Sequence, residues 1–360
     1  MEKKSKNVVN DKQTEIMASL KKLGTQMYNQ LDNGVFPTIS MPSRSTENIN
    51  YDHNLRQYIL GGKTVTRSAR NIRHVKPFTQ MAWAALFSNE LTSHRKTSTL
   101  RDVYYSAQAY NMTFKNQQES NNIITDLETA TGHAREEFHI FPEERSAVFG
   151  DLTIEYTVPG YEGKTLNLSA HPDGVLIGPA LTTSKFTHTS ADKIIAIEKG
   201  GLFTRFIEEK VHIKHKSILV LTSGQAPRQT RYFLRRLSDE LKIPVFIFTD
   251  GDPWGMHIAM VIISGSANAA HLRNLNTPDA TWSGVWASDI VKYKLPSDPL
   301  DEVDIKRLHE LQKDPRYQED PLWQKEIKIF LKIKRKAELE AYARYGLTYI
   351  VDKYLPTKLK

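Results

Sequence analysis

The chain has 360 residues, a net charge of +8 and no cysteine, which excludes disulfides and any metal site built on thiolates. It shows no apolar leader segment and no apolar run of about 18 residues, so we predict neither a signal peptide nor a membrane span. The positive charge is concentrated at the front, where residues 1–80 hold 13 Lys/Arg against 6 Asp/Glu. A polyanion partner or a solvated tail would each account for this bias, and charge alone does not choose between them.

An apolar stripe predicts an amphipathic helix near the N-terminus, from Thr14 to about Asn33. The stripe is narrow, which favours docking on one partner helix or groove over burial in a broad core. Residues 35–75 contain prolines and paired glycines and are typical of a basic arm, so we take 1–75 as an N-terminal helix and arm. The stripe consists of Ile16, Leu20, Leu23, Met27 and Leu31.

Two Gly-Lys-Thr strings, starting at Gly62 and Gly163, could be mistaken for phosphate-binding loops. A P-loop needs another glycine five residues earlier, and those positions hold Gln57 and Val158. We therefore expect that the chain does not bind ATP itself.

Residues 76–150 predict a small helical domain with a β-tail. Helices are expected over 77–92, from about Thr99, and over 120–130, where Gly132 would end the third. Thr99 and Asp102 have the spacing of a capping box at the start of the second helix. Three helices and a β-hairpin are typical of a winged helix-turn-helix domain, which places its third helix in the major groove of DNA.

The second of these helices carries the candidate nucleophile. Arg101 and Tyr105 are separated by four residues and share one helix face. Tyr104 instead shares an apolar face with Leu100 and Ala107, so we expect Tyr104 to be buried and Tyr105 to be exposed. A guanidinium beside Tyr105 would hold a phosphate and favour the phenolate. Taken by itself, Tyr105 could equally be an ordinary packing residue.

The stretch from residue 193 to 255 alternates short apolar runs with helical patterns, as expected for a parallel sheet with crossover helices. The first apolar run ends at Glu198 and the third at Asp250 and Asp252. Because the carboxyl ends of parallel strands line the site in such sheets, these acids should converge. A further strand is expected over 282–290, with Asp289 at its end, followed by a charged helical region over 301–354.

Converging carboxylates repel one another, and a hard divalent cation relieves the repulsion. Oxygen ligands without His or Cys nearby suit Mg²⁺, so Glu198, Asp250 and Asp252 are the predicted metal ligands. Two other interpretations remain. In one, Asp250 and Asp252 only shape a turn and cap a helix. In the other, they belong to a phosphatase, although that chemistry places its DxD after an early strand.

The motifs together resemble a known family. IEKGGLF at 197–203 and TDGDPWG at 249–255 resemble a TOPRIM domain, and more specifically the A subunit of DNA topoisomerase VI and its relative, the meiotic double-strand-break transesterase. RDVYY at 101–105 resembles the nucleophile motif of that family, and the resemblance covers roughly residues 75–355. It departs from the archaeal pattern at 224–228, which puts the substrate contacts of that loop in doubt.

The resemblance implies an α/β protein with an N-terminal winged-helix (CAP-like) domain over 76–150 and a TOPRIM Rossmann-like parallel-sheet domain with a helical extension over 151–360. It implies that Tyr105, assisted by Arg101, cuts DNA by transesterification and stays attached to the 5′ end. Mg²⁺ would sit on the three acids, with Glu198 either a ligand or a general acid/base.

The implied partners are double-stranded DNA, a second copy in a homodimer that pairs each Tyr with the acids of the opposite protomer, and an ATPase B subunit in an A2B2 assembly. The N-terminal stripe would contact that B subunit. The implied location is cytoplasmic and nucleoid-associated, or nuclear in a eukaryote. Two rivals share these features: a meiotic-type transesterase without strand passage, and a non-catalytic winged-helix DNA-binding protein.

Overall fold

The computed structural model describes residues 2–359, with side chains from residue 13. These residues form two compact units. The first unit comprises Met1–Asn50, Ile59–Glu143 and Ala267–Leu272, and the second comprises Tyr51–Tyr58, Glu144–Ser266 and Arg273–Lys360. None of the helices described is long and apolar enough to cross a membrane.

The first unit is mainly helical, with short strand pairs at its margins. Its helices are α1 (Glu2–Asp32), α2 (Ile72–His94), α3 (Leu100–Ala109) and α4 (Gln117–Thr131), with 3₁₀ turns η1 (Thr46–Asn48) and η2 (Ala267–Ala269). β1 (Thr38–Pro42) pairs with β4 (Thr64–Ser68), and β5 (Ser98–Thr99) pairs with β6 (Ile140–Phe141). The pair β2 (Ile49–Asp52) and β3 (Gln57–Leu60) runs from this unit into residues of the second.

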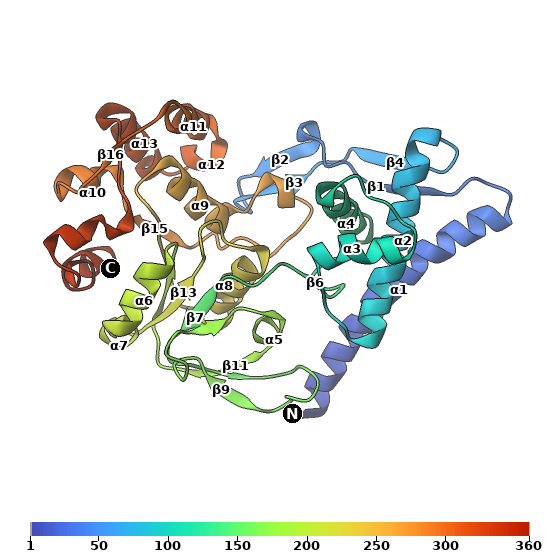
Figure 1. Cartoon of the computed structure of the whole chain (residues 1–360), viewed down its shortest axis with the longest axis horizontal. Coiled ribbons are helices and arrows are strands. Elements are labelled where there is room, and N and C mark those ends of the chain that lie inside the picture. The colour runs from blue at the N-terminus through green and yellow to red at the C-terminus, as the bar shows by residue number, and fades with distance from the viewer. Residues whose placement is uncertain (1, 360) are drawn as a thin grey trace. The chain divides into compact units, whose positions relative to one another are not determined.

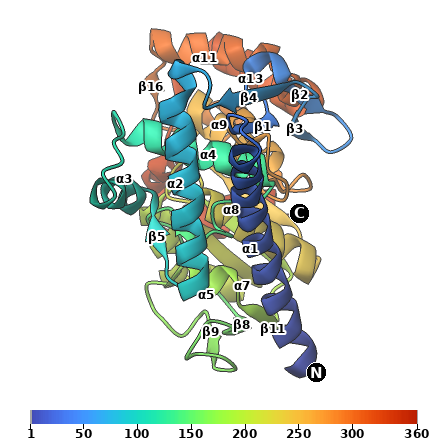
Figure 2. The same ribbon diagram turned by 90° about the vertical axis from the view of Figure 1, so that its right-hand side faces the viewer.

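The helices α1 and α2 lie side by side (Figure 2), and this packing corrects the expected role of the N-terminal stripe. Ile16, Leu20 and Leu23 are buried in the same apolar core as the side chains of α2. The amide of Gln13 also donates to the carbonyl of Thr92 on α2, at 2.7 Å. These three apolar residues therefore have a partner inside their own chain, and the expectation that they dock on a different chain is wrong.

Local capping signals set the ends of the other helices. The capping box of Thr99 and Asp102 at the start of α3 is confirmed, as is Gly132, in the left-handed region, at the end of α4. The helix expected from 77 begins earlier, because the Asn71 side chain accepts a hydrogen bond from the N–H of Arg73.

The β-hairpin expected after the third helix is not formed by the described residues 132–150. β6 pairs in parallel with β5, which precedes α3, and the next strand joins the sheet of the second unit. The winged-helix assignment of the first unit therefore stays a prediction.

The second unit is built on a sheet with helices on both faces. Its strands run in the order β10 (Val175–Leu176), β7 (Ala147–Phe149), β13 (Ser217–Leu221), β12 (Lys193–Ile197), β14 (Val245–Phe248) and β15 (Thr281–Gly284). The last four are parallel, whereas β7 and β10 are antiparallel additions at one edge. The expected parallel sheet with crossover helices is thereby confirmed.

The crossover helices divide between the two faces because β13 and β14 lie on opposite sides of β12, and crossovers are right-handed. Figure 1 shows α6 and α7 on one side of the strands and α8 on the other. The core consists of apolar residues from the strands and from the inner faces of these helices. The helices are α6 (Gly200–Glu208), α7 (Val211–Lys214), α8 (Arg228–Leu241) and α9 (Pro253–Ser264).

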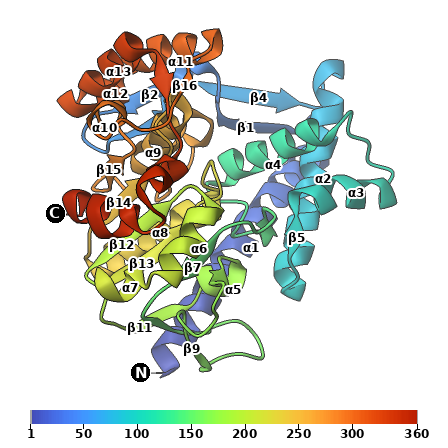
Figure 3. The same ribbon diagram turned by 60° about the vertical axis from the view of Figure 1, so that its left-hand side comes forward.

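The remaining elements extend this unit. A small antiparallel sheet has the order β11 (Lys185–Thr189), β8 (Leu152–Glu155) and β9 (Thr165–Asn167). The others are α5 (Pro179–Thr182), α10 (Ala287–Lys292), β16 (Asp298–Pro299), α11 (Glu302–Lys313), α12 (Pro315–Gln318), α13 (Pro321–Ile333), β17 (Arg335–Lys336), η3 (Leu339–Tyr345), η4 (Ile350–Tyr354) and α14 (Leu355–Lys358). In Figure 3 the C-terminal segment, in red, passes beside α6.

The strand expected over 282–290 is wrong beyond residue 284, because Asp289 forms a capping box at the start of α10. The Asp289 carboxylate is buried and does not mark a strand end. It accepts a hydrogen bond from Tyr354 at 2.7 Å and pairs with the ammonium of Lys358 at 2.8 Å. Asp289 therefore anchors the C-terminal segment.

Candidate active site

Two of the predicted acids meet because their strands are neighbours. β12 and β14 pair in register, with Ile197 opposite Phe248, so the residues that follow both strands leave the sheet at the same height. The N–H of Glu198 donates to the carbonyl of Phe248 at 3.0 Å. The N–H of Asp250 in turn donates to Oε2 of Glu198 at 2.9 Å. The structure thus joins the ends of the two strands through Glu198.

Asp252 is the N-cap of α9, where its Oδ1 accepts a hydrogen bond from the N–H of Gly255 at 2.6 Å. The turn is tight: a Cβ on Gly255 would lie 2.1 Å from the carbonyl oxygen of Asp250, closer than any side chain allows. The helix-capping interpretation of this acid is therefore correct for one of its oxygens. Capping also fixes the Asp252 carboxylate close to the other acids.

A segment near the C-terminus fastens the acidic turn. We call residues 335–340 the C-terminal strap. The N–H of Gly251 donates to the carbonyl of Ala337 at 2.7 Å, and the N–H of Ala337 donates back at 3.1 Å. The N–H of Leu339 donates to Oδ1 of Asp250 at 2.9 Å. The strap thus holds both the backbone and one carboxylate of the turn.

The acids raise each other's pKa. Burial raises the pKa of Glu198 to about 7, and the neighbouring charge of Asp250 adds to the effect. The pKa of Asp252 is also raised, first by burial and then by Asp250, against the hydrogen bond from Gly255. A cluster of carboxylates that resist ionisation is a typical feature of functional sites.

Lysines partly neutralise the cluster. Nζ of Lys199 lies 3.0 Å from Oδ2 of Asp250. Nζ of Lys336, on the strap, lies 2.5 Å from the carboxylate of Asp304, and its charge also acts on Asp252. Sequence reasoning missed both lysines. Lys199 is adjacent to Glu198 and could have been found, whereas Lys336 is far away in the sequence.

Among the residues with described side chains, no group of three or more His, Asp and Glu residues is arranged to hold a metal ion. Lys199 stands beside Asp250, where a metal ion would bind. The donor chemistry nevertheless fits a hard divalent cation, because Glu198, Asp250 and Asp252 offer only oxygens and their mutual repulsion raises the pKa of Glu198. The three acids thus fit such a cation once Lys199 is displaced.

The candidate nucleophile lies in the first unit, on α3. Tyr105 is 53% exposed and Arg101 is exposed, whereas Val103 and Ala107 form the buried face of this helix. Tyr104 is partly buried rather than fully buried, and its ring contacts that of Tyr105 edge-on at 5.3 Å. The expected exposure of Tyr105 is confirmed, but its catalytic role stays a prediction.

The loop whose sequence departs from the family pattern lies beside Glu198. The N–H of Gly224 donates to the carbonyl of Glu198 at 3.1 Å, and Oγ of Ser223 donates to the carbonyl of Arg145 at 2.7 Å. The loop thus supports the backbone that carries the acid.

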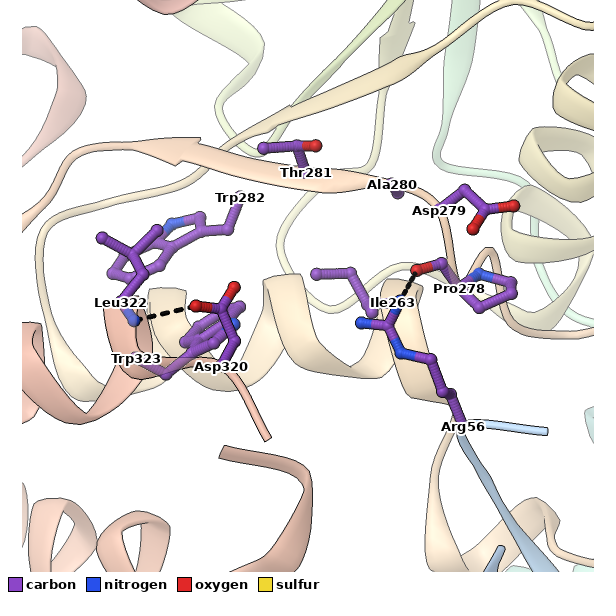
Figure 4. A pocket seen from close by; sticks show the side chains of 10 residues that line it. All are labelled: Arg56, Ile263, Pro278, Asp279, Ala280, Thr281, Trp282, Asp320, Leu322 and Trp323. Atoms are coloured by element: carbon purple, nitrogen blue, oxygen red, sulfur yellow. Dashed lines mark hydrogen bonds between the residues drawn. The ribbon is translucent and has the colours of Figure 1, made fainter. Parts of the chain in front are cut away.

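A separate pocket of about 310 Å³ lies at the start of β15, at the sheet edge opposite the acids (Figure 4). Its charged groups already have structural partners. Arg56 donates to the carbonyl of Pro278 at 2.6 Å, and Asp320 caps α13 by accepting from the N–H of Leu322 at 2.8 Å. We therefore do not assign the active site to this pocket.

Comparison with known proteins agrees with these features. Residues 193–359 match the Toprim-domain family of the topoisomerase 6 A subunit and Spo11, and residues 76–140 match the type IIB DNA topoisomerase family. The A subunit of type 2 DNA topoisomerase 6 from Methanothermobacter thermautotrophicus is 45% identical over 345 residues, covering 95% of this chain and 96% of that protein. The proteins of the same name from Halobacterium salinarum and Methanosarcina barkeri are 36% identical (96% of each chain) and 37% identical (94% of this chain, 93% of that protein). This chain belongs to the family of type 2 DNA topoisomerase 6 A subunits.

Proposed function

We propose that the chain is the DNA-cleaving subunit of a type IIB DNA topoisomerase, which makes a transient double-strand break in duplex DNA. The observation that carries the proposal is the bond between Asp250 and Glu198, which gathers acids from two parallel strands at the carboxyl edge of the sheet. Family membership supports the same activity.

Tyr105 is the proposed nucleophile. Its phenol oxygen attacks the scissile phosphorus, the bond to the 3′ oxygen breaks, and the chain becomes linked to the 5′ end as a phosphotyrosine. The phenol loses its proton as the new bond forms, and the departing 3′ oxygen gains one. The bond energy is kept in the phosphotyrosine, so the reverse reaction reseals the strand. Exposure of Tyr105 and Arg101 on α3 supports these roles, with Arg101 holding the phosphate.

Glu198, Asp250 and Asp252 are the proposed ligands of a divalent cation, Mg²⁺ in our proposal. When bound, the ion supplies positive charge that neutralises the scissile phosphate and stabilises the departing oxygen. Glu198 is also suited to giving a proton to the 3′ oxygen, because a carboxyl with a pKa of about 7 is protonated in part of the molecules at neutral pH.

The proposed assembly is a homodimer of this chain joined to two ATPase subunits, in which each Tyr105 works with the acids of the opposite protomer. An ATPase partner is required because neither Gly-Lys-Thr string has the P-loop pattern. DNA contacts are assigned to the first unit as a winged-helix domain, and the archaeal relatives support a cytoplasmic, nucleoid-associated location.

The test is to incubate the chain with supercoiled DNA, Mg²⁺ and ATP, with and without its ATPase partner, and then to denature and digest with protease. We expect linear DNA with peptide attached to both 5′ ends, and relaxation of the DNA only when the partner is present. Cleavage without any relaxation would favour a meiotic-type transesterase. DNA retention without a covalent product would leave only a DNA-binding function.

A further inference from the structure

Lys199 lies between two carboxylates of different kinds. Its Nζ is 3.0 Å from Oδ2 of Asp250 in the acidic turn and 3.6 Å from Oε1 of Glu338 on the C-terminal strap. The Asp250 side chain is 10% exposed, whereas that of Glu338 is 67% exposed. One ammonium is thus shared between a buried acid and an acid in water.

The two oxygens of Asp250 are held in different ways. Oδ1 accepts the N–H of Leu339, which is backbone and is fixed by the pairing of Ala337 with Gly251. Oδ2 is held by the ammonium of Lys199, at the end of a long side chain that can change rotamer. The contact to Oδ2 is therefore the exchangeable one, and a cation that binds Asp250 through Oδ2 displaces Lys199.

Glu338 offers the displaced ammonium a second partner without a large movement. It belongs to the same strap as Leu339, so the backbone contact and the alternative carboxylate are positioned together. A pair of Lys199 and Glu338 would be largely exposed to solvent, where an ion pair has a small net effect on stability. The movement would therefore be nearly balanced in free energy.

We propose that Lys199 is a built-in counter-cation of the acidic site, which neutralises Asp250 when no divalent cation is bound and moves to Glu338 when one binds. The inference rests on the proposed function, because it takes Asp250 as a metal ligand. It makes Lys199 a positioning residue that limits metal affinity and keeps the acids together in the empty site. A lysine that only fastened the start of α6 would not influence the affinity for metal in this way.

The test is a titration of the full-length chain with Mn²⁺ without DNA, followed by electron paramagnetic resonance of free Mn²⁺. Replacing Lys199 by Met removes the competitor, and we expect Mn²⁺ to bind roughly three- to tenfold more tightly. Glu338→Gln removes the second partner, so Mn²⁺ should bind more weakly in the wild-type background. In the Lys199→Met background, the same Glu338→Gln change should have little effect, because Glu338 acts through Lys199.

Lys216→Met is the matched control. It removes the same charge from the exposed residue before β13, at the sheet edge opposite the acids, and Mn²⁺ affinity should stay within about twofold of wild type. Unchanged or weaker binding by Lys199→Met would overturn the inference, as would equal effects of Glu338→Gln in both backgrounds. If Lys199→Met does not fold, as judged by circular dichroism, Lys199→Gln makes the same test.

Asp250→Asn separates this inference from the proposed function. If Asp250→Asn binds Mn²⁺ as the wild type does, the proposed metal site itself is wrong. If Asp250→Asn loses Mn²⁺ while Lys199→Met binds like the wild type, the metal site stands and only the role of Lys199 fails. A second readout is the melting temperature, since Mn²⁺ should stabilise Lys199→Met more than it stabilises the wild type.

Discussion

The backbone N–H of Asp250 donates a 2.9 Å hydrogen bond to the carboxylate of Glu198, 52 residues earlier in the chain. Such a bond favours the ionised carboxylate, yet the pKa of Glu198 is raised to about 7, because burial and the charge of Asp250 outweigh it. The bond therefore holds two acids together against their repulsion. The resulting arrangement is suited to a bound cation and to proton transfer near neutral pH.

Replacing Tyr105 by Phe should reduce DNA cleavage about a thousandfold or more, because the attacking oxygen is lost. DNA affinity should be nearly unchanged, since phosphate contacts dominate it. Tyr104→Phe is the control: it keeps the ring that packs against Tyr105 and should keep the activity. Covalent 5′ complexes are measured on denaturing gels, and a reversed result for the two variants would contradict the assignment from helix faces.

The stability of the metal-free protein should fall as the pH rises from about 4.5 to 7. In this window the folded protein keeps a proton on Glu198, whose pKa is about 7, whereas the unfolded chain has lost it at about 4.5. The stabilisation from this proton is present at low pH and is lost as the pH rises through the folded pKa. The contribution is at most about 3 kcal/mol.

Glu198→Gln should remove this pH dependence, because the amide does not titrate. Urea unfolding in EDTA at pH 5, 6, 7 and 8 gives the free energy of unfolding for both proteins. The difference between wild type and variant isolates the contribution of this residue from other titrating groups. Parallel pH profiles for the two proteins would show that Glu198 ionises at an ordinary pKa.

Gly255→Ala should disrupt the acidic turn, because the added Cβ would lie 2.1 Å from the backbone oxygen of Asp250. The backbone must shift to relieve this contact, at a cost of about 1–3 kcal/mol or more. We expect a lower melting temperature and loss of DNA cleavage. Gly200→Ala is the matched control on α6, since its Cβ meets nothing within 4 Å, and it should keep both properties. An active Gly255→Ala would show that the turn tolerates the shift.

Leu20→Ala should destabilise the first unit by about 2–5 kcal/mol, because this side chain is buried between α1 and the core that α2 shares. Leu31→Ala, on the same helix, should change stability by less than about 0.5 kcal/mol, since Leu31 is 61% exposed. Thermal or urea unfolding of the two variants measures both effects. Equal stability of the two would return Leu20 to the role of a docking residue.

Much of this protein is determined by local sequence. The alternation of apolar runs and helical patterns predicts the parallel sheet, and the acids at the strand ends follow from it. Because β12 and β14 are neighbours, Glu198 meets Asp250 as expected. The exposure of Tyr105 follows from helix periodicity, and the capping box of Thr99 follows from a spacing of three residues. Each of these depends on contacts within one element or between adjacent strands.

The tertiary structure decided the features that join distant parts of the chain. Leu339 and Lys336 reach the acidic turn from more than eighty residues away, and no local pattern marks a backbone N–H as the partner of a carboxylate. The stripe that includes Leu20 has the same periodicity whether it packs on α2 or on a different chain, so only the packed core identifies its partner. Sequence periodicity specifies which face of an element is apolar, whereas the surface that covers that face is chosen by the free energy of the whole fold.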